Sequence, residues 1–157
     1  MTGSGAPKDE VRAQGMKVAI VASSWHDSIV RSLIEAAQKA CADAGAKASL
    51  FRVAGSFELP VVALACAKAD FEAVVALGVI IRGNTPHFEY VCQAATDGLI
   101  RVALDTGVPV GYGLLTCDTE GQALARAGRP ASSEDKGAES AQAAIGAALV
   151  LRQFNAG

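Results

Sequence analysis

Residues 73–88 read AVVALGVIIRGNTPHF, a run of nine apolar residues followed by a short polar loop and the start of a new segment. The apolar run is rich in β-branched side chains, which is typical of a strand covered on both faces in a parallel sheet. Gly83 is expected to let the chain turn. Thr85 is expected to cap a helix that has Pro86 in its first position and Glu89 in its first turn. This stretch therefore predicts a buried strand that leads directly into a helix.

The start of that helix is a candidate anion site. The first N–H groups of a helix lack partners within the helix and carry partial positive charge. In an open parallel sheet, ligands bind beyond the carboxyl ends of the strands, where this loop is expected to lie. Arg82, Thr85 and His87 are close by in sequence. From these residues alone, a well-capped helix start with a solvated His87 explains the pattern equally well.

The composition favours one domain in which helices pack on a sheet. Of the 157 residues, 51% are hydrophobic but only 5% aromatic, so the expected core consists mainly of Ala, Val, Leu and Ile. The low aromatic content argues against a surface that stacks nucleic-acid bases, and a net charge of -2 gives no reason to expect a polyanionic partner. We expect residues 1–15 to form a flexible tail and residues 16–157 to form a single domain.

Two further expectations concern the cellular setting. No apolar run approaches the roughly 20 residues needed to span a bilayer, so we expect no membrane association and a cytoplasmic location. The four cysteines occur singly, at Cys41, Cys66, Cys92 and Cys117, without a Cys-x-x-Cys pair. We therefore expect buried free thiols and no metal site.

The rest of the chain alternates strand and helix patterns. Expected strands cover residues 17–22, 48–53 and 110–116, and expected helices cover 26–44, 60–69, 86–105 and 134–153. A short helix is expected to begin near Thr119, and the last helix is expected to bury Ile145, Leu149 and Val150. This order predicts an α/β fold, a three-layer αβα sandwich around a four-stranded parallel sheet with right-handed crossovers.

Several spaced motifs accompany this pattern. They are SSWH at 23–26, GSFELP at 55–60, ALGVIIRG at 76–83, TPHFEYV at 85–91, QALARAG at 122–128 and KG at 136–137. Together, and in this order, they resemble the lumazine synthase family, and the resemblance covers essentially everything after residue 15. It implies a flavodoxin-like sheet, no cofactor, and active sites shared between adjacent subunits of a homopentamer.

The resemblance also implies a reaction. Members of this family condense 5-amino-6-(D-ribitylamino)uracil with 3,4-dihydroxy-2-butanone 4-phosphate. The products are 6,7-dimethyl-8-ribityllumazine, phosphate and water, in the penultimate step of riboflavin biosynthesis. Both reactive groups belong to the substrates, so the protein is expected to contribute mainly positioning, anion binding and proton transfer.

By this resemblance, one set of residues binds the pyrimidine substrate. Trp25 matches the aromatic residue that stacks on the pyrimidine ring. Tyr112 occupies the position at which a neighbouring subunit usually offers Phe to the same ring. The other matching positions are Ser56, Phe57, Glu58, Val79, Ile80 and Ile81. Without the resemblance, Glu58 reads as a solvated residue before a helix, and the three strand residues read as core.

A second set matches the phosphate site and the proton-transfer residue. His87 matches the latter, because an imidazole both accepts and donates protons near neutral pH. Asn84 and Thr85 match the phosphate contact, and Arg126 matches an arginine whose guanidinium takes two phosphate oxygens. Lys136 lies near a helix start, where a cation is unfavourable unless it faces an anion. The remaining candidates, His26, Arg101, Arg129 and Arg152, are expected to be ordinary surface residues.

The chain departs from the family pattern in two places. Residues 128–136 read GRPASSEDK, which is longer and contains a proline, unlike the Gly-rich connection of members that build large closed shells. We therefore predict an isolated pentamer. Cys117, Asp118 and Gly121 stand where other residues are commoner in the family, so the details of the short helix start stay open.

Two other functions remain compatible with the sequence. One is a binding protein of the same fold that holds a lumazine or flavin without turnover. The other is a flavodoxin-like signalling or assembly domain, since a fold by itself does not fix a function.

Overall fold

The computed structural model describes residues 3–8 and 10–155. At its centre is a four-stranded parallel sheet with the strand order β2-β1-β3-β4. The strands are β1 (Lys17–Ser23), β2 (Lys47–Val53), β3 (Ala73–Ile81) and β4 (Val110–Cys117). Because all neighbouring strands are parallel, their carboxyl ends lie along one edge of the sheet.

Strand β3 lies inside the sheet, between two neighbouring strands. It pairs with β1 on one side, where Val74 lies opposite Ala19, and with β4 on the other, where Leu77 lies opposite Gly113. Its first seven residues are buried. Both of its faces are covered, which explains why its sequence is apolar throughout rather than alternating.

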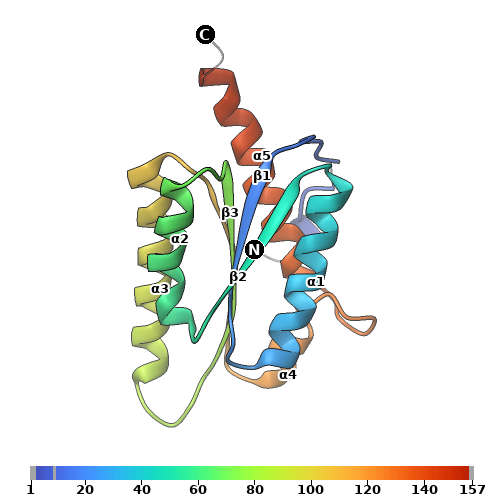
Figure 1. Cartoon of the computed structure of the whole chain (residues 1–157). Coiled ribbons are helices and arrows are strands. Elements are labelled where there is room, and N and C mark those ends of the chain that lie inside the picture. Colours follow the sequence, from blue (N-terminus) through green and yellow to red (C-terminus); the bar gives the residue numbers. More distant parts are fainter. Residues whose placement is uncertain (1–2, 9, 156–157) are drawn as a thin grey trace.

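Helices cover both faces of the sheet (Figure 1). One layer contains α1 (Asp27–Asp43) and α5 (Lys136–Asn155), and the other contains α2 (Leu59–Lys68) and α3 (His87–Thr106). The short elements are the 3-10 turns η1 (Gly3–Gly5) and η2 (Ser56–Glu58) and the helix α4 (Glu120–Leu124). Each helix layer packs on its own core, so the predicted three-layer αβα sandwich is confirmed.

The start of α3 differs from the prediction in its capping. Pro86 is the N-cap residue and His87 the first helical residue, and no side chain caps the helix. Thr85 lies one position too early, so its Oγ1 accepts only a long hydrogen bond of 3.4 Å from the His87 N–H. Gly83 is not in the left-handed region, and a Cβ added there meets nothing within 4 Å. The expected role of Thr85 as the helix cap is therefore wrong, and the turn at Gly83 does not itself require a glycine.

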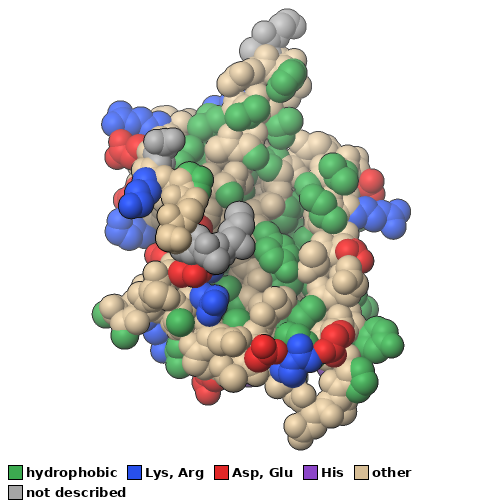
Figure 2. Space-filling view, turned by 180° about the vertical axis from the view of Figure 1, so that it is seen from behind, with side chains coloured by type: hydrophobic (Ala, Val, Ile, Leu, Met, Phe, Trp, Pro, Cys, Tyr) green, Lys and Arg blue, Asp and Glu red, His purple; other side chains and the backbone are tan. Residues whose placement is uncertain are grey.

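The last helix also differs in part. Ile145 is fully buried, as expected, but Val150 is 52% exposed. The reason is that the end of α5 projects beyond the sheet (Figure 1), where no second layer covers it. Figure 2 shows hydrophobic side chains exposed on this projecting end, and Leu151 and Phe154 are among the exposed apolar residues of the helix.

The segment before β1 contacts the body of the domain. Ala13 is buried, and its N–H donates to Ala44 O at 2.7 Å, while the Gly15 N–H donates to Gly45 O at 2.8 Å. Residues 1–2 and 9 lie outside the described residues. The flexibility of residues 1–15, and residues 16–157 as a single domain, stay predictions.

The cysteines are free thiols, as expected. Cys41, Cys66 and Cys117 are buried and Cys92 is half-buried, and burial raises the pKa of Cys41 to about 11. Within the described part of the chain, no helix combines the length and the apolar character that crossing a membrane requires.

The contact between β4 and α5 gives a stability prediction. A Cβ added to Gly111 would lie 2.2 Å from Ser140 O, a backbone atom that cannot rotate away. We expect Gly111→Ala to lower the free energy of unfolding by about 1–3 kcal/mol or more, measured by urea unfolding. The control is Gly146→Ala on α5, where a Cβ meets nothing within 4 Å and better helix propensity should stabilise by about 0.5–1 kcal/mol. Equal midpoints for the two variants would contradict this account of the packing.

Candidate functional site

A cleft with a volume of about 780 Å³ lies at the carboxyl edge of the sheet. The segment between β1 and α1, the turn η2, the end of β3 and one face of α3 form its walls. It brings together the predicted residues Trp25, Ser56, Phe57, Glu58, Val79, Ile80, Ile81 and His87. Most of the predicted pyrimidine site therefore lies around one cleft within a single chain.

Aromatic rings surround this cleft. Trp25 is 68% exposed, Phe57 is 65% exposed and Tyr90 is 74% exposed, although all three are large and apolar. Such rings can sandwich a flat heterocycle, which gains from both burial and stacking. Tyr90 was not among the site residues predicted from the sequence. Its spacing from His87 could have identified it, because residues three apart on a helix share a face.

The floor beneath the cleft contains two buried hydroxyls. Ser23 and Ser56 are at most 5% exposed, and neither Oγ has a hydrogen-bond partner among the described residues. A Cβ added to Gly78 would lie 2.8 Å from the Ser56 Oγ and 3.0 Å from the Ser23 Oγ, so this glycine keeps the floor open. Because a buried hydroxyl without a partner is costly, the Ser56 hydroxyl is available to a polar group in the cleft.

The turn η2 orients the carboxylate of Glu58. Its Oε2 accepts a hydrogen bond from the Gly55 N–H at 2.9 Å, and its own N–H donates to Gly55 O at 3.2 Å. This hydrogen bond holds the carboxylate at the wall of the cleft, while Glu58 is exposed to solvent, as the residues alone had indicated.

Both histidines line the cleft. His87 is exposed at the start of α3, next to the loop that carries Asn84 and Thr85. His26, expected to be only a surface residue, lies beside Trp25 as the N-cap residue of α1, with φ 56 and ψ 49. It is the one residue other than glycine with a positive φ in the described ranges. Asn84 and Thr85 are exposed but do not line the cleft.

Arg126 and Lys136 lie side by side, outside this cleft. A backbone bridge joins Ala127 to Asp135, and the Lys136 N–H donates to Arg126 O at 3.0 Å. Lys136 is the first residue of α5. Its Nζ forms ion pairs with the carboxylates of Glu134 at 2.9 Å and Glu139 at 2.7 Å. Burial lowers the pKa of Lys136, but these carboxylates outweigh it, so the pKa is raised overall.

The loop between Arg126 and Lys136 is fixed to α1. Arg129 is half-buried, and its guanidinium donates to the Ser32 Oγ at 2.9 Å and to Ser28 O at 2.6 Å. The expectation that Arg129 is an ordinary surface residue is therefore wrong. Its long-range contacts hold the loop, and no local sequence pattern predicts them.

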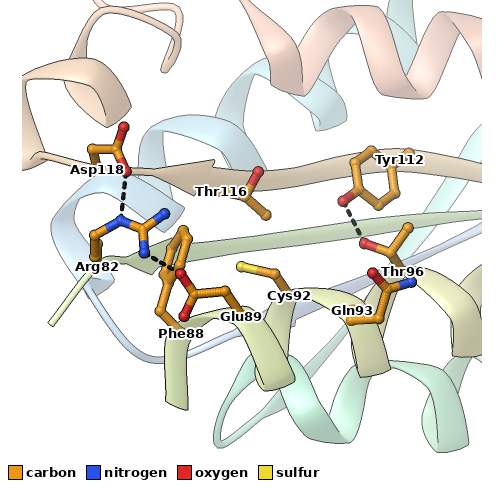
Figure 3. Close-up of a pocket in the computed structure, with 9 residues that line it drawn as sticks. All are labelled: Arg82, Phe88, Glu89, Cys92, Gln93, Thr96, Tyr112, Thr116 and Asp118. Atoms are coloured by element: carbon orange, nitrogen blue, oxygen red, sulfur yellow. Dashed lines mark hydrogen bonds and ion pairs between the residues drawn. The ribbon is translucent and has the colours of Figure 1, made fainter. Parts of the chain in front are cut away.

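A second cleft of about 450 Å³ lies between α3 and β4 (Figure 3). It uses a different face of α3 from the first cleft. Tyr112 lines this second cleft, and its hydroxyl lies 2.7 Å from the Thr96 Oγ1. Tyr112, like Arg126 and Lys136, is thus separate from the cleft that contains Trp25.

In the part of the chain that the structure describes, no group of three or more His, Cys, Asp or Glu side chains is arranged to hold a metal ion. The fold and the cleft define the class of protein. It is a flavodoxin-like α/β protein with an aromatic-lined cleft for a small molecule at the carboxyl edge of its sheet.

Comparison with known proteins identifies the family. A family model described as 6,7-dimethyl-8-ribityllumazine synthase matches residues 15–152. A curated protein of that name from Leifsonia xyli subsp. xyli is 57% identical, over 97% of this chain and 98% of the relative. Others are 54% identical in Streptomyces coelicolor (99% and 98%) and 56% identical in Clavibacter sepedonicus (97% and 97%). The chain belongs to the 6,7-dimethyl-8-ribityllumazine synthase family, which confirms the resemblance, and it is an enzyme.

The hydroxyl pair in the second cleft can be tested directly. We expect Tyr112→Phe and Thr96→Val each to remove the same hydrogen bond, so a double-mutant cycle should give a coupling of about 0.5–1 kcal/mol. The measurement is the free energy of unfolding of the wild type, both single variants and the double variant. Strictly additive effects would show that the two hydroxyls do not interact.

Proposed function

We propose that this chain condenses 5-amino-6-(D-ribitylamino)uracil with 3,4-dihydroxy-2-butanone 4-phosphate. The products are 6,7-dimethyl-8-ribityllumazine, phosphate and water. The observation that carries the proposal is that a chain of this family gathers Trp25, Phe57, Glu58 and His87 around one cleft. No cofactor is needed, because both reactive groups belong to the substrates.

The pyrimidine is proposed to bind between the exposed aromatic rings. Trp25 and Phe57 come from different elements and both line the cleft, so they can hold a flat ring in a fixed orientation. The carboxylate of Glu58 can accept hydrogen bonds from ribityl hydroxyls, and the hydroxyl of Ser56 can bond a polar group at the floor. Val79, Ile80 and Ile81 supply the apolar wall at the end of β3.

The phosphate is proposed to bind at the start of α3. Residues 82–87 are all exposed, and no side chain caps the helix, so its first N–H groups can face an anion. Gly83 has neither a strained backbone nor a neighbour that its Cβ would meet. A glycine at that position is therefore easier to explain by close approach of a ligand, next to Asn84 and Thr85.

His87 is proposed to transfer protons at the junction of the two substrates. It lines the cleft and is also the first residue of the helix that faces the phosphate. Holding two reactants together can supply about 7–11 kcal/mol of the barrier, whereas a positioned acid–base group adds typically about 10²–10⁴-fold. Proximity should therefore outweigh the contribution of any single side chain.

We further propose that adjacent subunits of a homopentamer complete each site. Tyr112, Arg126 and Lys136 lie outside the cleft of their own chain, so a neighbouring subunit would have to present them. Exposed apolar side chains on α3, such as Ile100 at 56% and Leu104 at 77%, are consistent with a protein–protein interface. The proline-containing loop at 128–136 favours an isolated pentamer rather than a shell, which light scattering can distinguish.

Two properties of the whole protein complete the proposal. Its four cysteines are free thiols, which suits the reducing cytoplasm. Its net charge of -2 and its few aromatic residues give no support for a nucleic-acid partner.

The reaction is tested by incubating the purified protein with both substrates. We expect phosphate release together with the absorbance of a lumazine. Binding of the ribitylated pyrimidine without phosphate release would instead support a binding protein. No affinity for the pyrimidine would support a signalling or assembly domain.

Replacing the histidine tests the balance between proximity and proton transfer. We expect His87→Ala to lower kcat by roughly 10²-fold or less, because substrate positioning is retained. The assay is steady-state phosphate release at saturating concentrations of both substrates. Complete loss of activity in a correctly assembled variant would refute the dominance of proximity.

Replacing the arginine tests the shared site. We expect Arg126→Ala chiefly to raise the KM for the four-carbon phosphate, because the variant loses a bidentate anion contact. Trp25→Ala should damage the pyrimidine side instead. If neighbours share sites, random co-assembly of the two variants should restore about a quarter of the sites, since one cleft then combines an intact half from each subunit. No recovery in mixed oligomers would place both residues in the same subunit's site.

A further inference from the structure

We propose that Arg82 is a positioning residue that fixes the loop at residues 83–86, and through it His87 and the proposed phosphate site. This inference rests on the proposed function of that loop. Arg82 is the last residue before the loop and does not line the larger cleft, so its effect would be indirect.

The loop has almost no support of its own. All of its residues are exposed, and a Cβ on Gly83 would meet nothing within 4 Å. The hydroxyl of Thr85 accepts only the long hydrogen bond from the His87 N–H. A loop without packing takes its geometry from the points at which its two ends are held.

The side chain of Arg82 connects those two points. Its Nε donates to the Asp118 Oδ1 at 2.7 Å, just beyond β4, and its Nη1 pairs with the Glu89 Oε1 in the first turn of α3. Its guanidinium carbon lies 4.3 Å from the centre of the Phe88 ring (Figure 3). The Arg82 N–H donates to Cys117 O at 2.9 Å, which fixes the other end of the loop to the sheet. One residue thus holds the strand edge and the helix start together.

The charges indicate positioning rather than direct binding of the anion. Hydrogen bonds to Asp118 and Glu89 raise the pKa of Arg82, and the bond from Arg82 lowers the pKa of Glu89. These three side chains together carry a net negative charge, so the guanidinium has no excess charge to offer a phosphate. Its planar fork is suited instead to holding two carboxylates in a fixed relation.

The exposure of the Arg82 side chain predicts how its loss should affect stability and catalysis. The side chain of Arg82 is 44% exposed, and exposed ion pairs contribute little to global stability, typically about 0.2–1 kcal/mol. Catalysis is more sensitive, because a misplacement of about 1 Å can cost on the order of 10²-fold in rate. Loss of the contacts that Arg82 makes with Asp118 and Glu89 should therefore affect phosphate binding and turnover more than the free energy of unfolding.

The chain offers a matched control. Arg152 forms a similar pair of hydrogen bonds with Glu72, from Nε at 2.9 Å and from Nη2 at 2.9 Å, and its side chain is also 44% exposed. Glu72 comes just before β3, at the opposite end of that strand from the loop. Arg152→Gln therefore removes a comparable ion pair without touching residues 83–87.

The experiment compares Arg82→Gln with Arg152→Gln in the full-length protein. For Arg82→Gln we expect the KM for the four-carbon phosphate and the inhibition constant of inorganic phosphate each to rise about tenfold, with the pyrimidine KM changed less than about twofold. Amide hydrogen exchange at 83–88 should accelerate. Arg152→Gln should change none of these, and both variants should unfold at similar temperatures. Arg82→Lys, which keeps the charge but loses the fork, should fall between the wild type and Arg82→Gln.

Three results would overturn the proposal. The first is an unchanged phosphate KM and inhibition constant in Arg82→Gln. The second is a rise in both substrate KM values together with a much lower unfolding temperature than the control, which would show a general structural role. The third is unchanged hydrogen exchange at 83–88. If the wild type releases no phosphate from its substrates, the proposed function fails, and hydrogen exchange with inorganic phosphate binding still decides the role of Arg82.

Discussion

The structure depends on the parallel pairing of β3 with β1 and β4. Strand β3 has a parallel neighbour on each side and helices on both faces. Its carboxyl end therefore lies at the same edge of the sheet as the carboxyl ends of β1 and β4. The loop before α3 must therefore emerge beside Trp25 and the turn η2. Residues that are far apart in sequence become the walls of one cleft because these strands run in the same direction.

The sequence was sufficient to predict most of the fold. The apolar run of β3 and the regular alternation of strand and helix patterns are local signals, and both carry over into the structure. The errors arose where tertiary context decides. The N-cap position of α3 is taken by Pro86, one residue after Thr85. Val150 is exposed because α5 continues past the layer that buries Ile145.

The candidate site was predictable to a different degree in each part. The resemblance to the family predicted Trp25, Glu58 and His87 as site residues, and the structure brings them around one cleft because the carboxyl ends of the parallel strands lie at one edge of the sheet. The adjacency of Arg126 and Lys136 depends on a backbone bridge and on the anchoring of Arg129 to α1, which no periodic pattern encodes. Tyr90 was not predicted, because its only signal in the sequence is the helix face that it shares with His87.

The course of α5 has a practical consequence. The helix starts at Lys136, beside Arg126, and its far end is tied to the residue before β3 by the pair of hydrogen bonds between Arg152 and Glu72. The end of α5 therefore lies at the amino edge of the sheet, opposite the carboxyl edge at which the cleft with His87 lies. A fluorophore, an affinity handle or a fused cargo joined through that terminus would stand clear of entering substrate, so immobilised or labelled preparations should retain an open entrance.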